Sequence, residues 1–139
     1  MDEYGKVLFR AAGEISIGRR MHIYDNMDNE MAFIQQRLFR LMPRFSVYMG
    51  GSHVADIVKN FTLFSQDYRI EGLDWKVSGD WLAHDYTITS GGRYIASIHK
   101  HWMTWGDSFE IDIADGEDFV MVLAVIIAIE CVIDNAQSS

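Results

Sequence analysis

Apolar residues recur at every second position through most of the chain, a pattern typical of strands with one buried face and one wet face. The clearest alternation lies in residues 44–49, 75–78, 85–89 and 109–113. Gly50-Gly51 and Gly91-Gly92 lie between such segments, and glycine tolerates the positive φ that tight hairpin turns need. The pattern therefore predicts a meander of short antiparallel strands.

The end of the chain has a different pattern, because Phe119 to Ile129 is an unbroken apolar run. Asp115 is expected to cap a helix there, with Asp118 three residues later in a position like that of a capping box. We predict a helix over residues 116–133. Its many β-branched residues make a buried strand the alternative, but the length and the acidic start favour a helix.

A helix that is apolar on every side must be surrounded on every side. Fifteen helical residues reach only about 22 Å, short of the roughly 30 Å hydrocarbon core of a membrane, so we expect no transmembrane segment. The predicted fold class is mainly β with one helix: an antiparallel meander barrel that encloses the helix. Because the chain has no linker and no long repeat, we expect one domain over residues 1–139.

The net charge of −8 argues against binding to nucleic acid or, broadly, to anionic membranes. The charge is uneven, since residues 1–69 hold nine basic and eight acidic residues, whereas residues 70–139 hold three and twelve. If a polyanion binds to this chain, the first half is therefore the better candidate. The single cysteine, Cys131, and an N-terminus unlike a signal peptide favour a cytoplasmic protein.

No nucleophile elbow, phosphate-binding loop or dinucleotide fingerprint occurs in the chain. We therefore assign no catalytic residue and no cofactor. Cys131 lies in the apolar helix and is expected to be an inert core residue. His99 and His101 project from one face of a strand, but a third metal ligand is missing, so no metal site is assigned.

Glu130 interrupts the apolar helix and has two interpretations. One is a buried carboxylate with a raised pKa. The other, which we favour, is a side chain that reaches the barrel mouth or pairs with an arginine.

A group of arginines in the first half forms the candidate ligand-binding site, because guanidinium forks suit phosphate or carboxylate groups. An alternative is a solvated barrel rim that balances the acidic half. The candidate residues are Arg19, Arg20, Arg37, Arg40 and Arg44.

Four stretches of the chain resemble the bacterial branch of the LURP-one-related family: 16–25 (SIGRRMHIYD), 71–75 (EGLDW), 79–86 (GDWLAHDY) and 102–111 (WMTWGDSFEI). The resemblance covers nearly the whole chain. It implies the fold shared by tubby and the phospholipid-scramblase C-terminal domain, which is a twelve-stranded antiparallel barrel around a hydrophobic C-terminal helix.

Members of this family usually have further strand-forming residues ahead of the segment that residues 7–17 match. We therefore expect the barrel to lack one or two strands, and exposed strand edges would then favour a homo-oligomer such as a homodimer. The resemblance implies little about function, since bacterial members are mostly uncharacterised, plant members are linked to defence and tubby domains bind phosphoinositides.

The sequence thus predicts a non-enzymatic binding or scaffold domain of unknown ligand. One alternative is a binder of anionic lipid headgroups or phosphate that uses the arginine cluster, although an analogy of fold is weak evidence of function. The other alternative is an enzyme with its site at a barrel mouth.

Overall fold

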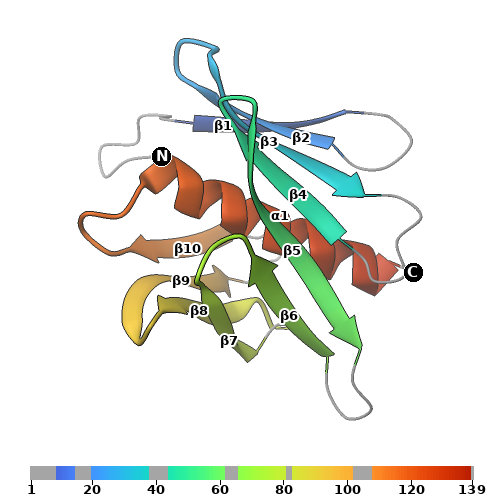
Figure 1. Cartoon of the computed structure of the whole chain (residues 1–139), viewed down its shortest axis with the longest axis vertical. Coiled ribbons are helices and arrows are strands. Elements are labelled where there is room, and N and C mark those ends of the chain that lie inside the picture. Colours follow the sequence, from blue (N-terminus) through green and yellow to red (C-terminus); the bar gives the residue numbers. More distant parts are fainter. Residues whose placement is uncertain are drawn as a thin grey trace.

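Two antiparallel sheets lie on either side of one long helix (Figure 1). The computed structural model describes residues 9–14, 20–37, 44–61, 66–80, 83–101 and 108–138. In these residues the strands follow one another in chain order within each sheet, so the predicted meander is confirmed.

The larger sheet has six strands: β1 (Phe9–Glu14), β2 (Arg20–Asp25), β3 (Glu30–Arg37), β4 (Arg44–Met49), β5 (Ser52–Phe61) and β6 (Gln66–Glu71). The smaller sheet has four: β7 (Lys76–Asp80), β8 (Asp85–Ser90), β9 (Arg93–His101) and β10 (Ser108–Ile113). The helix α1 spans Phe119–Ser138. The mainly β fold with one helix is therefore confirmed. Within the described residues the two sheets do not close into one barrel, which agrees with the expected incomplete form.

The hairpin turns form where the glycine pairs predict them. Gly50 and Gly51 join β4 to β5 with φ of 57° and 80°. Positive φ at both central residues matches the right-handed twist of the flanking strands, and side chains resist that conformation.

Helix α1 begins three residues later than predicted, and the expected capping by Asp115 is wrong. The Glu117 amide donates to the Ala114 carbonyl at 3.3 Å, with Gly116 at φ 86°, so the chain makes a turn where the helix was expected to start. The Asp118 carboxylate accepts from the Met121 amide at 3.2 Å and is the actual N-cap. The helix also continues beyond Ile133, the predicted end.

The hydrophobic core lies between the helix and the two sheets. Val122, Val125 and Ile129 of α1 are fully buried and belong to one cluster with residues of both sheets. Cys131 is buried in this cluster, as predicted. Of the helices in the described residues, none has the length and apolar character needed to cross a membrane.

Candidate functional site

The outer face of the six-stranded sheet, the face turned away from α1, carries ordered rows of polar and aromatic side chains. Strand register sets these rows, because residues two apart along a strand share a face. His22, Phe33 and Tyr48 lie opposite one another on β2, β3 and β4, and Tyr48 faces His53 on β5. We call His22, Phe33, Tyr48 and His53 the aromatic row.

The rings of the aromatic row contact one another across the sheet. The ring centroids of His22 and Phe33 are 4.8 Å apart, those of Phe33 and Tyr48 are 5.9 Å apart, and those of Tyr48 and His53 are 5.2 Å apart. The interplanar angles are 33°, 31° and 35°, so neighbouring rings are tilted within the range that aromatic pairs favour. The row is a continuous platform of partly exposed rings.

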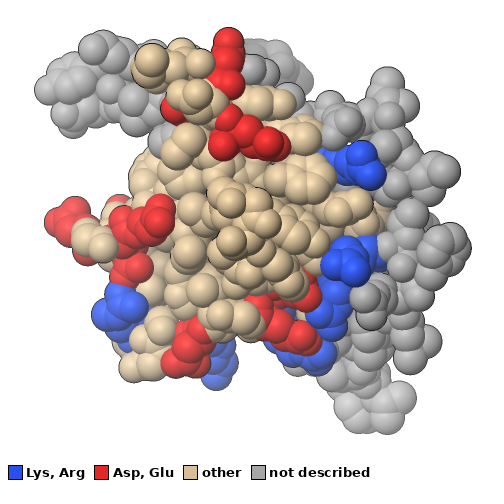
Figure 2. Space-filling model, turned by 45° about the horizontal axis from the view of Figure 1, so that its top comes forward, with Lys and Arg blue, Asp and Glu red and all other residues tan. Residues whose placement is uncertain are grey.

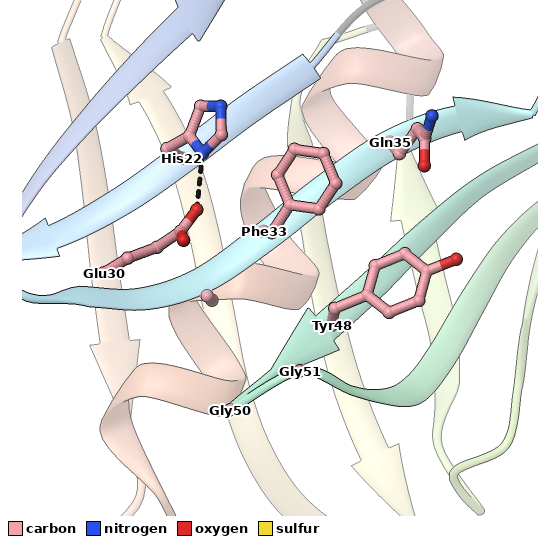
Figure 3. Close-up of a pocket in the computed structure, with 8 residues that line it drawn as sticks. His22, Glu30, Phe33, Gln35, Tyr48, Gly50 and Gly51 are labelled. Atoms are coloured by element: carbon pink, nitrogen blue, oxygen red, sulfur yellow. Dashed lines mark hydrogen bonds and ion pairs between the residues drawn. The ribbon is translucent and has the colours of Figure 1, made fainter.

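A pocket of about 410 Å³ lies over this platform, within the size range of small-molecule sites. Figure 3 shows the side chains of Phe33 and Tyr48 over the strands, with the Gly50-Gly51 turn beside them. Because a Cβ at either glycine would meet nothing within 4 Å, this turn leaves the pocket open. The lining residues are His22, Glu30, Ala32, Phe33, Gln35, Tyr48, Gly50 and Gly51.

One end of the pocket carries an ion pair between His22 Nδ1 and Glu30 Oε1 (Figure 3). The Glu30 side chain is 47% exposed, so its carboxylate is accessible from the pocket. The pair fixes the ring of His22 against Phe33. This end therefore offers an acidic acceptor next to a stacked ring.

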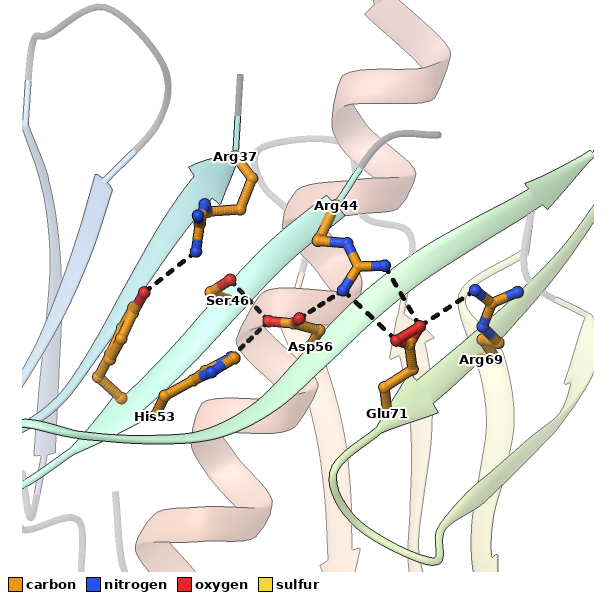
Figure 4. A network of polar contacts seen from close by, with 8 residues as sticks. Arg37, Arg44, Ser46, His53, Asp56, Arg69 and Glu71 are labelled. Atoms are coloured by element: carbon orange, nitrogen blue, oxygen red, sulfur yellow. Dashed lines mark hydrogen bonds and ion pairs between the residues drawn. The ribbon is translucent and has the colours of Figure 1, made fainter. Parts of the chain in front are cut away.

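A second group of side chains on the same face, the outer network, consists of Arg44, Ser46, His53, Asp56, Arg69 and Glu71 (Figure 4). Arg44 Nη1 donates to Asp56 Oδ2 at 2.5 Å, and its Nη2 donates to Glu71 Oε1 at 3.2 Å. The second carboxylate oxygen of Asp56 accepts from Ser46 Oγ at 2.6 Å and lies 2.6 Å from His53 Nε2. His53 thereby joins the outer network to the aromatic row.

The network perturbs the ionisation of its members. Burial raises the pKa of Asp56, but hydrogen bonds with Ser46, His53 and Arg44 outweigh that desolvation and leave the pKa below its usual value. The hydrogen bond from Arg69 lowers the pKa of Glu71 most, ahead of the hydrogen bond from Arg44. Both carboxylates are therefore held ionised.

Arg44, a predicted ligand-binding residue, is engaged by the outer network. Burial lowers its pKa, but hydrogen bonds to Asp56 and Glu71 outweigh the desolvation, so the pKa is raised. Its two carboxylate partners compensate its charge within the protein. Arg44 therefore holds neighbouring side chains of the outer face in place.

Unlike Arg44, Arg37 and Arg20 do not belong to the outer network. Arg19 and Arg40 fall outside the described residues. Arg37 Nη1 donates to the Tyr48 hydroxyl at 3.4 Å, and no carboxylate pairs with Arg37 among the described residues. Arg20 lies opposite Gln35 in the register, and its buried Nε has no partner within the described part of the chain. Figure 2 shows basic side chains gathered along the right-hand side of a broad uncharged surface.

Glu130 belongs to a third cluster, inside the molecule. Its carboxylate contacts His84 Nδ1 and accepts from the Tyr86 hydroxyl at 2.9 Å. Pairing with an arginine, one of the two arrangements favoured from the sequence, is not found among the described residues: the partners are His84, in the turn before β8, and Tyr86 of β8. Burial and then the charge of Glu130 raise the pKa of Tyr86 well above its usual value.

His99 and His101 lie on the exposed side of β9, with ring centroids 4.8 Å apart. His99 Nδ1 lies 3.6 Å from Asp85 Oδ1, and His101 Nε2 lies 3.4 Å from Glu110 Oε2. Within the described ranges, no group of three or more His, Cys, Asp or Glu side chains is placed to hold a metal ion.

Sequence reasoning missed the aromatic row. Alternation in residues 44–49 puts Tyr48 on the wet face of its strand, but alternation within one strand does not show that Tyr48 faces His53 across the hairpin. The signal was present, since the Gly50-Gly51 turn fixes which residues of β4 and β5 are opposite. A similar step across the 26–29 loop brings His22 beside Phe33.

The fold and this face define a small β-rich domain with a ligand-sized pocket on the outside of its larger sheet. Residues 1–130 match the LURP-one-related family, and the chain belongs to that family. The uncharacterised protein YxjI of Bacillus subtilis (strain 168) is 30% identical over 128 residues, which cover 91% of this chain and 79% of YxjI. An X-ray structure of an Arabidopsis thaliana protein is also similar, with 15% identity, a TM-score of 0.47 and coverage of 91% of this chain and 92% of the plant protein.

Proposed function

We propose that this protein is a non-catalytic binding domain whose ligand occupies the pocket over the aromatic row. The observation that carries the proposal is the pocket of about 410 Å³ above a continuous row of rings. Small-molecule sites combine mostly apolar and aromatic linings with a few well-placed polar groups. Phe33 and Tyr48 provide the aromatic lining, and Glu30 and Gln35 provide the polar groups.

The rings are held in place by partners outside the pocket lining, and this supports the proposal. Tyr48 accepts from Arg37 through its hydroxyl, and its ring contacts His53, which Asp56 holds. Side chains that are already ordered lose less conformational entropy when a ligand binds. The outer network therefore acts as a support for the platform.

A thermal-shift screen of a small-metabolite library tests the proposal. We expect compounds that raise the Tm of the native chain to lose this effect in Phe33→Ala, because that substitution removes the centre of the platform. Phe109→Ala is the matched control, since Phe109 is a 44% exposed aromatic residue of the four-stranded sheet. Hits that remain in Phe33→Ala and disappear in Phe109→Ala would contradict the proposal.

A second candidate is binding of an anionic lipid headgroup through the arginine cluster. It is favoured by Arg20 and Arg37, which have no carboxylate partner among the described residues. The double variant Arg20→Ala/Arg37→Ala is its test, because Arg44 is committed to the outer network. We expect salt-sensitive sedimentation with phosphoinositide or cardiolipin vesicles that this variant loses, and unchanged sedimentation of the variant would exclude the candidate.

A further inference from the structure

We propose that the pocket takes a nucleoside monophosphate, with its base over Phe33 and Tyr48 and its phosphate at Arg37 and Arg20. The inference rests on the proposed binding function and names the ligand class. Three features of the outer face carry it: a ring platform, uncompensated arginines beside one end of it and a carboxylate acceptor at the other end.

The platform suits a flat heteroaromatic ring. Phe33 and Tyr48 are direct neighbours across β3 and β4, and their rings are 5.9 Å apart with an interplanar angle of 31°. A nucleobase stacks on such rings with little dependence on its identity, since every base has a π-face. The Gly50-Gly51 turn puts no side chain in its way.

The arginines next to the platform differ in how far their charge is compensated. Arg44 and Arg69 pair with carboxylates of the outer network. Arg37 instead donates to the neutral hydroxyl of Tyr48. The charge of Arg37 is therefore available beside the edge of a ring that lines the pocket, where it suits a phosphate.

Arg20 adds a second positive charge on the same side. It lies opposite Gln35, and Gln35 is two residues before Arg37 on the same face of β3. Its buried Nε has no partner among the described residues, and a buried unpaired donor favours an acceptor. Two arginines match the two charges of one phosphate monoester.

The opposite end of the pocket supplies an acceptor for the base. Glu30 uses Oε1 for His22, and Oε2 has no partner within the described part of the chain. A carboxylate oxygen accepts from the exocyclic amino group or a ring N–H of a base. The side chain of Gln35 offers both a donor and an acceptor between the two ends.

Size and charge favour a mononucleotide over a nucleic acid strand. The volume of about 410 Å³ is in the range that encloses one small molecule. A polymer would bring many phosphates to a chain whose net charge is −8, which repels them. One phosphate at a local pair of arginines avoids that repulsion.

Calorimetric titration of the full chain with AMP, adenosine and ribose 5-phosphate tests the inference. We expect AMP to bind at least about tenfold more tightly than either fragment, since a charge-assisted hydrogen bond and a stacked ring are each worth that factor. Equal affinity for adenosine and AMP would remove the role of the arginines. Equal affinity for ribose 5-phosphate and AMP would remove the role of the platform.

Two variants separate the contribution of the phosphate contact from that of base stacking. Arg37→Ala is expected to lower the affinity for AMP about tenfold or more and that for adenosine much less, because adenosine has no phosphate and is affected only through the lost hydrogen bond to Tyr48. Phe33→Leu is expected to weaken AMP and adenosine alike, and if this variant does not fold, Arg37→Ala decides. Lys76→Ala, on β7 of the other sheet, is the control and should change neither. An Arg37→Ala variant that binds AMP like the native chain would overturn the inference.

The outcomes also distinguish this inference from the proposed function. Absence of AMP binding at millimolar concentration overturns the nucleotide assignment. The binding function would still stand if the library screen yields hits that depend on Phe33, and it would fall with the assignment if no such hit appears. Tighter binding of an oligoadenylate than of AMP would overturn the mononucleotide and point to a nucleic acid ligand.

Discussion

The two sheets place their polar clusters on opposite sides. The six-stranded sheet keeps its polar cluster, the outer network around Asp56, on the face turned away from the helix. The four-stranded sheet keeps its cluster inside, where His84 and Tyr86 meet Glu130 of α1. The outer face of the four-stranded sheet carries exposed contacts: His99 lies 3.6 Å from Asp85, His101 lies 3.4 Å from Glu110, and the Tyr94 hydroxyl donates to Asp112 Oδ2 at 2.6 Å.

This difference assigns a structural role to the inner cluster, which is Glu130 with His84 and Tyr86, and a recognition role to the outer network. The inner cluster ties the helix to the smaller sheet, because its hydrogen bonds are made in the core, where leaving a polar group unpaired is costly. The outer network ties no second layer to the sheet among the described residues. It holds exposed side chains in fixed positions, which is what a binding face requires.

The largest effect on stability is expected at the inner cluster. Glu130→Ala leaves the buried His84 ring and the Tyr86 hydroxyl without their acceptor, so the free energy of unfolding should fall by about 2–4 kcal/mol. Urea denaturation measures it. Glu130→Gln keeps a carbonyl acceptor for Tyr86 and should lose less. A loss below about 0.5 kcal/mol in Glu130→Ala, the range of ordinary surface changes, would mean that the cluster does not anchor the helix.

The outer network should have the next largest effect. Asp56→Ala removes the acceptor of Ser46, His53 and Arg44, so we expect a loss of about 2–3 kcal/mol in the free energy of unfolding. Asp85→Ala is the matched control: Asp85 is also a strand carboxylate that faces a histidine, but it is 61% exposed. Its loss should stay within about 0.5 kcal/mol. Equal losses in the two variants would contradict the difference between the outer faces of the six-stranded and four-stranded sheets.

Acid should weaken the native chain through the same network. The pKa of Asp56 is lower in the folded protein than its usual 3.8, so the unfolded chain takes up protons first as the pH falls. The stability that Asp56 contributes is present above about pH 4 and disappears as the pH falls through the folded pKa. Denaturation at pH 7 and at pH 3 should therefore show a smaller acid-induced loss in Asp56→Ala than in the native chain. The same loss in both would place the acid-sensitive groups elsewhere.

The smallest effect on stability is expected at Arg37. Its one hydrogen bond among the described residues is the 3.4 Å contact with the Tyr48 hydroxyl, so Arg37→Ala should change the free energy of unfolding by less than about 0.5 kcal/mol. Thermal or urea denaturation measures it. A larger loss would show that Arg37 supports the fold, and its effect on ligand affinity would then need the Arg37→Lys variant for interpretation.

Alternation and turn chemistry were enough to predict the antiparallel meander and the buried C-terminal helix. They did not predict the division into sheets of six and four strands, because pairing between β6 and β7 depends on how the chain bends around the helix. The capping by Asp115 failed because Gly116 adopts a positive φ that ends the turn before the helix begins.

The clusters were beyond pattern reasoning for a similar reason. Glu130 and His84 are 46 residues apart, and Arg44 and Glu71 are 27 apart, so only the register and the position of the helix bring them together. The arginines were found from composition, but the sequence did not indicate that Arg44 is engaged by carboxylates while Arg37 is not. The cytoplasmic location and the homodimer stay predictions.

A crystallographic fragment soak of the native chain compares the two outer faces most directly. Flat aromatic acids should occupy the pocket over Phe33 and Tyr48, with their acidic groups toward Arg37, while the outer face of the four-stranded sheet around His99 and His101 stays empty. Fragments that bind the four-stranded face and leave the aromatic row unoccupied would contradict the assignment of the larger sheet as the binding surface.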